Sequence, residues 1–420
     1  MMQSLNHRWL LLLAGLAVLA AVTSATSEAT MSTHKQLMIP GPVEFHEDVL
    51  AAAGGLAQSH VDPEFIGQFG ETIEMLRKVF VTEKGQPFVV SGSGTLGWDM
   101  VAANLVEAGE AVLVLNTGYF GDRFGECLET YGAAVTHVRA PKVGDRPSLA
   151  DIEAALDAAP AGGYKLVTIT HVDTSTGVLM DVQLIAELVA RKAPNTLVIV
   201  DGVCSVGGED LQVDAWKLGA VLTGSQKALG TPPGLSIVVV GEAAMKVFEA
   251  RKTPVPNYYA SWKRWAPIMR AYEERRPSYF ATPAVQLVQS LRVSLQLILQ
   301  QTPDVRERFA RHAAVSEEVK NEIESWGLSL VPVSRDKAAH TMTAVYLPEG
   351  MAPTQLLPLI ARRGVMVAGG LHADIAPRYF RIGHMGISVM EGGRGHIANV
   401  LRVLKEALVE AGHKFPKSEL

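Results

Sequence analysis

The sequence is poor in cysteine and carries no large excess of charge of either sign. Its 420 residues include two cysteines, Cys127 and Cys204, which are too few for a secreted disulfide framework. The sequence does not exclude a disulfide between them, but we expect both to be buried as small apolar residues. The formal net charge of −5 is small for this length, and no basic patch indicates a nucleic-acid partner. Clusters of Cys and His with zinc spacing are also missing, so no metal site is predicted.

What is present is the composition of an ordinary globular protein. Hydrophobic residues make up 48% of the chain and charged residues 19%, which excludes a disordered chain. A chain of this length can bury a sizeable core and is long enough for two domains.

The first thirty residues read as a leader and not as part of the fold. Residues 9–22 form an apolar run that small residues follow. This run is shorter than the ~20 residues of a membrane-spanning helix. We therefore predict a cleavable targeting or signal-like leader at 1–30, with Met31 as a second plausible start and no stable membrane association once the leader is removed. The last residues, 418–420, differ from a peroxisomal signal at their middle position, so localisation stays undetermined.

Short β-branched runs alternate with stretches of helical period from about residue 85 to 240. Helical period is clear at 149–159 and 182–192. This alternation predicts an α/β domain with a mostly parallel sheet that is covered on both faces. Ligands of such sheets bind at the carboxyl ends of the strands. The runs are PFVVSGS, AVLVLNTG, AVTHVRAP, KLVTITHVD, TLVIVDGV, AVLTGSQK and LSIVVVG.

The pattern changes after residue 285 to long amphipathic helices and a few strands. It predicts a smaller α+β domain of helices packed on an antiparallel sheet. We place a large domain with an N-terminal arm at 31–290 and a small C-terminal domain at 291–420. The helices are expected at 285–300, 305–326 and 396–411, and the strands at 341–347, 364–368 and in the segment YFRIGHMG.

A glycine-rich turn follows the first predicted strand. Gly92, Gly94 and Gly97 satisfy the dinucleotide pattern GxGxxG, so a nicotinamide-dependent dehydrogenase is one alternative. Such a site needs an acid at the end of the next strand, and that strand ends in Asn116. A phosphate cradle at a helix N-terminus fits better. A plain strand-to-helix turn that binds no ligand is a further alternative.

A lysine and an acid follow two of the buried runs. Lys227 comes directly after a run that predicts a buried strand, and burial lowers the pKa of a lysine and makes its amine nucleophilic. Asp201 ends the preceding run, twenty-six residues earlier, so neighbouring strands would place both in one crevice. A carboxylate there suits the ring nitrogen of an electron-sink cofactor. The plainer interpretations are a lysine that extends to the surface and an acid that caps a helix.

Two further segments carry polar groups that suit a ligand. The loop HVDTSTG, at 171–177, offers three successive hydroxyls, although it would also serve as an ordinary polar loop. Arg381 stands between apolar neighbours in the predicted strand YFRIG. Its planar guanidinium matches a carboxylate in two parallel hydrogen bonds, and a structural ion pair is the alternative.

Together and in this order, these segments resemble the class V pyridoxal-phosphate aminotransferases. Within that family they are most similar to the alanine–glyoxylate group, which includes the serine–pyruvate and serine–glyoxylate enzymes. The resemblance extends over about 38–408. It rests on the segments MIPGP, SGSGT, THVDTSTG, VDGVCSVGG, TGSQKAL, SYFATP and FRIGHMG.

The resemblance implies the type I fold of pyridoxal-phosphate transferases, whose large domain has a seven-stranded sheet. Lys227 would hold pyridoxal 5'-phosphate as a Schiff base and move the proton, and Asp201 would pair with the pyridine nitrogen. Phe120 would stack on the ring, where better-known members have Trp. Thr174 would lie near the ring hydroxyl. The residues implied for the phosphate are Ser93, Gly94, Thr95 and Gln226.

The resemblance also implies a substrate site and a partner. Arg381 would bind the substrate carboxylate, and the backbone near Gly41 would line the pocket. Tyr279 and Thr282 match residues that reach the phosphate of the other subunit, which implies a homodimer with shared active sites.

The reaction that the resemblance implies is transfer of an amino group from L-alanine or L-serine to glyoxylate by a ping-pong cycle. Another amino donor stays open, as does a cofactor-binding protein without catalysis. A cysteine desulfurase is disfavoured because no cysteine follows Cys204. Peroxisome or mitochondrion would be the compartments of such an enzyme.

Overall fold

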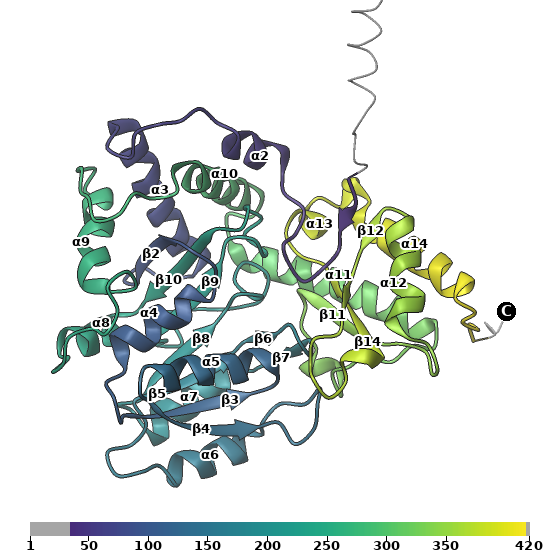
Figure 1. Cartoon of the computed structure of the whole chain (residues 1–420), viewed down its shortest axis with the longest axis horizontal. Helices are drawn as coiled ribbons and strands as arrows, with labels where there is room; N and C mark the ends of the chain where they lie inside the picture. The colour runs from purple at the N-terminus through teal and green to yellow at the C-terminus, as the bar shows by residue number, and fades with distance from the viewer. Residues whose placement is uncertain (1–33, 417–420) are drawn as a thin grey trace, which may run out of the picture. The chain divides into compact units, whose positions relative to one another are not determined.

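The computed structural model describes residues 34–416 of the chain. The leader predicted at 1–30, the second start at Met31 and the terminal residues 418–420 lie outside this range. The chain divides into the units Met1–Gln36 and Leu37–Leu420. Of the first unit the structure describes only the last residues, where strand β1 (Gln36–Leu37) begins. The following paragraphs concern the second unit (Figure 1).

A seven-stranded sheet forms the centre of the fold, and each strand lies in one of the seven predicted runs. The strand order is β2-β10-β9-β8-β5-β3-β4. Only β10 runs against its neighbours β2 and β9, so the mostly parallel sheet is confirmed. The strands are β2 (Gln86–Ser91), β3 (Ala111–Asn116), β4 (Ala134–Arg139), β5 (Leu166–Thr170), β8 (Leu197–Asp201), β9 (Ala220–Gly224) and β10 (Leu235–Val240).

The central strands are covered on both faces. Every residue of β5, β8, β9 and β10 is buried, which explains why their sequences are continuous apolar runs without alternation. Helices α4 and α5 pack together, as do α6 and α7. The helices around the sheet are α2 (Glu47–Ala53), α3 (Pro63–Val79), α4 (Leu96–Leu105), α5 (Tyr119–Thr130), α6 (Leu149–Asp157), α7 (Val182–Lys192), α8 (Glu242–Glu249), α9 (Trp262–Glu273) and α10 (Val285–Gln301).

Several of these helices begin where the sequence supplies a cap. Asp62 accepts a hydrogen bond from the N–H of Glu64, and Pro63 follows at the first helical position of α3. Ser148 and Asp151 form a reciprocal capping box at the start of α6. Local side-chain hydrogen bonds therefore define where these two helices begin.

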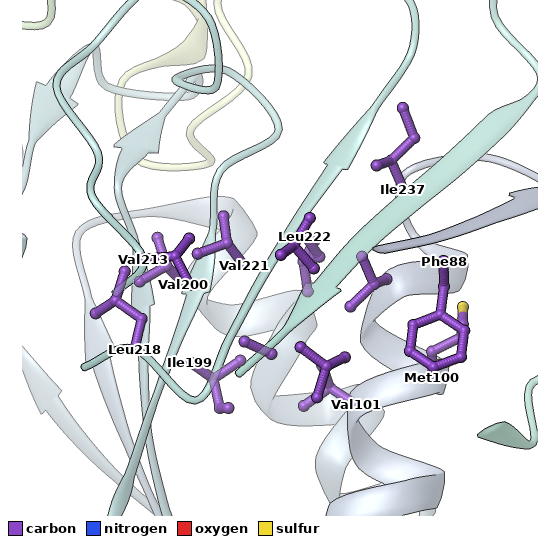
Figure 2. Packing of buried hydrophobic residues seen from close by; sticks show 14 of the residues in the cluster. Phe88, Met100, Val101, Ile199, Val200, Val213, Leu218, Val221, Leu222 and Ile237 are labelled. Carbon is purple, nitrogen blue, oxygen red and sulfur yellow. The ribbon is translucent and has the colours of Figure 1, made fainter. Parts of the chain in front are cut away.

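The large hydrophobic core lies between the sheet and its helices. Figure 2 shows Leu222 and Ile237 on neighbouring strands, with Val101 and Met100 of α4 and Phe88 of β2 nearby. All five side chains are completely buried. The core therefore fixes α4 against the strands whose ends carry the polar segments predicted from the sequence.

The C-terminal part has its own core and its own sheet. Strands β11, β14 and β13 pair antiparallel in that order, as expected for an α+β domain. The boundary predicted at residue 290 falls within α10, and it stays a prediction. The elements are α11 (Val305–Ser325), β11 (Met342–Tyr346), α12 (Pro353–Arg362), β12 (Val365–Met366), β13 (Ala368–Gly369), β14 (Tyr379–Gly383), α13 (Ile387–Met390) and α14 (His396–Glu410).

Both thiols are free, Cys204 buried and Cys127 partly exposed. Within residues 34–416, no helix combines the length and the apolar composition that crossing a membrane requires.

We expect the core of the parallel sheet to dominate stability. Leu113, in β3, is completely buried, whereas Leu184, in α7, is 44% exposed. Leu113→Ala should lower the free energy of unfolding by about 2–5 kcal/mol, because it removes buried methyl groups and leaves a cavity. Leu184→Ala is the matched control and should cost less than about 0.5 kcal/mol. Urea unfolding of both variants measures the difference, and equal losses would contradict this assignment of the core.

Candidate active site

A cavity opens at the carboxyl ends of the sheet strands, where the sequence predicted a ligand. Strands β2, β5, β8 and β9 run in the same direction, so the segments that follow them emerge at one edge. The polar residues predicted for a cofactor meet here, although they come from positions 93 to 227. The lining residues are Ser93, Gly94, Thr95, Trp98, Phe120, Thr170, Val172, Thr174, Asp201, Val203, Cys204, Gln226 and Lys227.

The turn between β2 and α4 offers unpaired donors. Within the described residues, no acceptor takes the backbone N–H groups of Gly94 and Thr95. Gly94 lies so close to Val203 that an added Cβ would be 3.0 Å from its Cγ2. Unpaired N–H groups at the start of a helix suit a phosphate.

Gln226 lines the same cavity, and its side-chain amide lacks a hydrogen-bond partner among the described residues. Its Oε1 is buried and makes no hydrogen bond within residues 34–416. A buried polar atom without a partner is costly, and a half-turn of the amide would present its NH2 group as a donor instead. The predicted phosphate site therefore has donors that lack acceptors, which fits a bound phosphate group.

Asp201 is a buried carboxyl at the end of β8. The indole Nε1 of Trp98 donates to its Oδ2 at 2.8 Å, and the backbone N–H of Val203 donates to its Oδ1 at 3.0 Å. Burial raises the pKa of Asp201 to about 6, although both hydrogen bonds act in the opposite direction. Trp98 was not assigned to the site from sequence, where its place near the start of a helix after SGSGT was the only signal.

Lys227 follows β9 and extends toward the N-terminal arm. Its Nζ donates a hydrogen bond to the carbonyl of Pro40. Burial is the largest cause that lowers its pKa, and the positive charge of Arg381 lowers it further. Cys204 and Asp201 act to raise it. A lysine with a lowered pKa has more neutral amine at neutral pH, which a nucleophile and proton carrier requires.

Gly41, predicted to line the substrate pocket, contacts this lysine. Its φ of +118° lies in a region that side chains disfavour. A Cβ added to Gly41 would be 2.4 Å from Cδ and 2.6 Å from Nζ of Lys227. Glycine is therefore required for the backbone to pass directly over the lysine.

Arg381 stands in β14 and is held by two backbone carbonyls. Its Nε donates to the oxygen of Gly369 at 2.8 Å, and its Nη1 donates to the oxygen of Thr174 at 3.0 Å. No Asp or Glu of the described residues lies within ion-pair distance of it, and Asp173 acts on its pKa through charge alone. The alternative of a structural ion pair is therefore wrong. A guanidinium has five donors, so several stay available for a carboxylate.

The loop after β5 contacts both Phe120 and Arg381. Phe120, in the first turn of α5, lies edge-on to Trp98 with ring centroids 6.4 Å apart. Its backbone N–H donates to the buried Asp173 at 3.3 Å, and the N–H of Ser175 donates to the same carboxyl at 2.9 Å. Burial raises the pKa of Asp173. Asp173 lies in the loop predicted at 171–177, but its contact with the N–H of Phe120 was not predicted from the sequence.

Tyr279 and Thr282 do not line the cavity of their own chain. Both are exposed, Tyr279 by 64%, and their hydroxyl oxygens are 3.4 Å apart. Their role in the site of a second subunit stays a prediction.

Comparisons with known proteins identify the family of this chain. The family described as Aminotransferase class-V matches residues 26–389. Alanine–glyoxylate aminotransferase 1 of Saccharomyces cerevisiae is 39% identical over 383 residues, which cover 89% of this chain and 97% of the yeast protein. Alanine–glyoxylate aminotransferase of Nostoc sp. is 30% identical with a TM-score of 0.82, covering 91% of this chain and 97% of that one. Ureidoglycine–glyoxylate aminotransferase of Bacillus subtilis is 26% identical with a TM-score of 0.83, covering 93% and 97%.

Substituting Gly41 should impair the lysine without unfolding the protein. In Gly41→Ala the new methyl group would overlap the Lys227 side chain, so we expect at least a tenfold loss of affinity for pyridoxal 5'-phosphate. Absorbance of the protein-bound cofactor measures this affinity. The control is Gly67→Ala, in α3, where an added Cβ meets no atom within 4 Å. Unchanged cofactor binding in Gly41→Ala would show that the arm moves aside.

Protonation of Asp201 should weaken cofactor binding at acid pH. Its pKa of about 6 means that the carboxyl is ionised above pH 6 and able to pair with a protonated ring nitrogen. As pH falls below 6 this attraction is lost, and the affinity should decline by up to about tenfold per pH unit. Besides burial, the groups that act on this carboxyl are the backbone N–H of Val203, Trp98, Asp173 and Lys227.

The measurement is a cofactor titration from pH 5 to 8 in the wild type and in Asp201→Asn. Any pH dependence of the cofactor phosphate or of Lys227 appears in both proteins, so their difference isolates Asp201. Parallel profiles would refute the assignment.

Proposed function

The chain belongs to the class V aminotransferases, and we propose that it transfers the amino group of L-alanine (or L-serine) to glyoxylate, giving pyruvate (or hydroxypyruvate) and glycine. It is an enzyme dependent on pyridoxal 5'-phosphate. When bound, this cofactor stabilises the negative charge that is left on an amino acid after Cα loses its proton.

The position of Arg381 carries the proposal. Amino acids and 2-oxo acids share an α-carboxylate, and Arg381 is held in place by the carbonyls of Gly369 and Thr174, keeps free donors and acts on Lys227 through its charge. A carboxylate bound there in two parallel hydrogen bonds would orient the substrate Cα toward the lysine amine.

Lys227 supplies the proton transfer. Its amine has a lowered pKa, so a neutral Nζ accepts the proton from the substrate Cα and later delivers it. The amino donor and the acceptor both need Arg381 for their carboxylate and the same amine for their proton. The first product must therefore leave before the second substrate enters, which gives ping-pong kinetics.

Asp201 keeps the ring nitrogen protonated. Its two oxygens each accept one hydrogen bond, from Trp98 and Val203, so its rotamer is fixed before the cofactor arrives. Each carboxylate oxygen accepts more than one hydrogen bond, so an acceptor position stays available for the ring N–H.

The charges of the cavity support small substrates with one carboxylate. Within the described part of the chain, Lys227 is the only Lys or Arg that lines the cavity, and Arg381 is the one other cation whose charge acts on it. With Arg381 assigned to the α-carboxylate, this supports substrates without a second carboxylate. All three compared proteins have glyoxylate in their names, whereas the donor named is alanine for two and ureidoglycine for one. This supports glyoxylate as acceptor more strongly than alanine as donor.

We propose in addition that the enzyme is a homodimer. The exposure of Tyr279 and Thr282, at a distance from the cavity of their own chain, supports a contribution of these hydroxyls to the phosphate site of a second subunit.

The absorption spectrum of the cofactor-loaded enzyme tests the reaction. Addition of L-alanine should bleach the yellow absorption as the amino group moves to the cofactor, and glyoxylate should restore it. Lys227→Ala, which lacks the amine, should not cycle. Bleaching by another amino acid but not by alanine or serine would overturn the donor and leave the aminotransferase intact. A protein that bleaches but is restored only by a different 2-oxo acid would overturn glyoxylate.

A further inference from the structure

The two carbonyls that hold Arg381 belong to segments far apart in the chain. Gly369 ends β13, whereas Thr174 lies in the loop after β5. They take different nitrogens of the guanidinium, so their separation sets the plane in which its remaining donors point. A residue that fixes the distance between these two segments would therefore control how Arg381 meets a carboxylate.

One hydroxyl joins the two segments. Tyr379 is completely buried, and its OH donates to the carbonyl of Ser175, the residue after Thr174. The same oxygen accepts the backbone N–H groups of Leu371 at 2.8 Å and His372 at 2.9 Å, just beyond Gly369. A phenol has one donor and two acceptor positions, and all are used.

The tyrosine ring is itself immobile. Tyr379 precedes Arg381 by two positions in β14, so both side chains leave the same face of the strand. Gly370 packs against the ring, where an added Cβ would be 2.5 Å from Cε1. On the other side, Ser175 is anchored because its hydroxyl donates to Asp173 at 2.6 Å and accepts the N–H of Tyr119 at 3.0 Å.

We propose that Tyr379 is a positioning residue for substrate binding, whose hydroxyl holds the segments of Thr174 and Gly369 at the spacing that orients the Arg381 guanidinium. This inference rests on the proposed function, in which Arg381 binds the substrate carboxylate. Tyr379 acts through Arg381 and through backbone, and it does not line the cofactor cavity.

Two consequences distinguish positioning from general support of the fold. Loss of the hydroxyl should raise KM for L-alanine and for glyoxylate alike, because both present a carboxylate to Arg381. The affinity for pyridoxal 5'-phosphate should stay within about twofold, because Val172 and Thr174 are the only residues lining its cavity that belong to the loop held by Tyr379, within the described part of the chain.

The first experiment compares Tyr379→Phe with Tyr346→Phe in the cofactor-loaded enzyme. Tyr346 lies opposite Tyr379 in the β11–β14 ladder, and its hydroxyl makes no hydrogen bond within residues 34–416, so it is a matched control. We expect KM for both substrates to rise about tenfold in Tyr379→Phe and to stay unchanged in Tyr346→Phe. An unchanged KM in Tyr379→Phe would overturn the inference, even if its melting temperature fell.

A double-mutant cycle with Arg381→Lys provides the decisive test. If Tyr379 acts through Arg381, removing its hydroxyl in the Arg381→Lys background should raise KM by less than about twofold more. Full additivity of the two effects would overturn the inference. If Arg381→Lys alone leaves KM unchanged, the carboxylate site of the proposed function fails instead, so the two failures are distinguishable.

Should Tyr379→Phe not fold, 3,5-difluorotyrosine at position 379 keeps the ring and the hydroxyl but makes the oxygen a weaker acceptor. A rise in KM that is absent when the same residue replaces Tyr346 would support the inference, and an unchanged KM would overturn it.

Discussion

A carboxyl at the end of a completely buried strand must be hydrogen-bonded or protonated, and Asp201 is in this position. Its two hydrogen bonds come from elements that the sheet itself places: Val203 continues β8, and Trp98 belongs to the helix after β2. Trp98 in turn stacks on Phe124, with ring centroids 5.5 Å apart, and lies edge-on to Phe120. Fixing this one carboxyl therefore fixes the arrangement of the rings around it.

The sheet and most of the site could be predicted because both follow from the parallel arrangement. A buried parallel strand is a continuous apolar run, and its end is where polar residues begin, so Asp201 and Lys227 were predicted from their positions, whereas the role of Thr174 came from the family resemblance. The glycine-rich turn was harder, because its pattern also fits a dinucleotide. Asn116 resolves this: its amide donates to Asp122 and accepts the N–H of Gly118, so the end of β3 is occupied by a local turn.

The contacts that escaped prediction join residues distant in sequence through side-chain packing. Trp98 meets Asp201 across 103 positions, and Tyr379 meets Ser175 across 204. Neither hydrophobic periodicity nor the position of strand ends predicts such pairs, because each contact depends on how two segments distant in sequence pack against each other. The alternative of a structural ion pair for Arg381 failed for the same reason, since backbone carbonyls and not a carboxylate hold it.

The loop after β5 has a further consequence for how this enzyme could change over generations. Asp173 holds the start of α5 beneath Phe120, and the next residue, Thr174, supplies a carbonyl to Arg381. The contacts that position Phe120 and Arg381 thus lie on adjacent peptide units. A mutation here that shifts Arg381 would also shift Phe120, the ring predicted to stack on the cofactor, so under the proposed function cofactor binding and substrate binding are thermodynamically linked. Variants with a new donor preference should therefore arise more readily on β13 than in this loop.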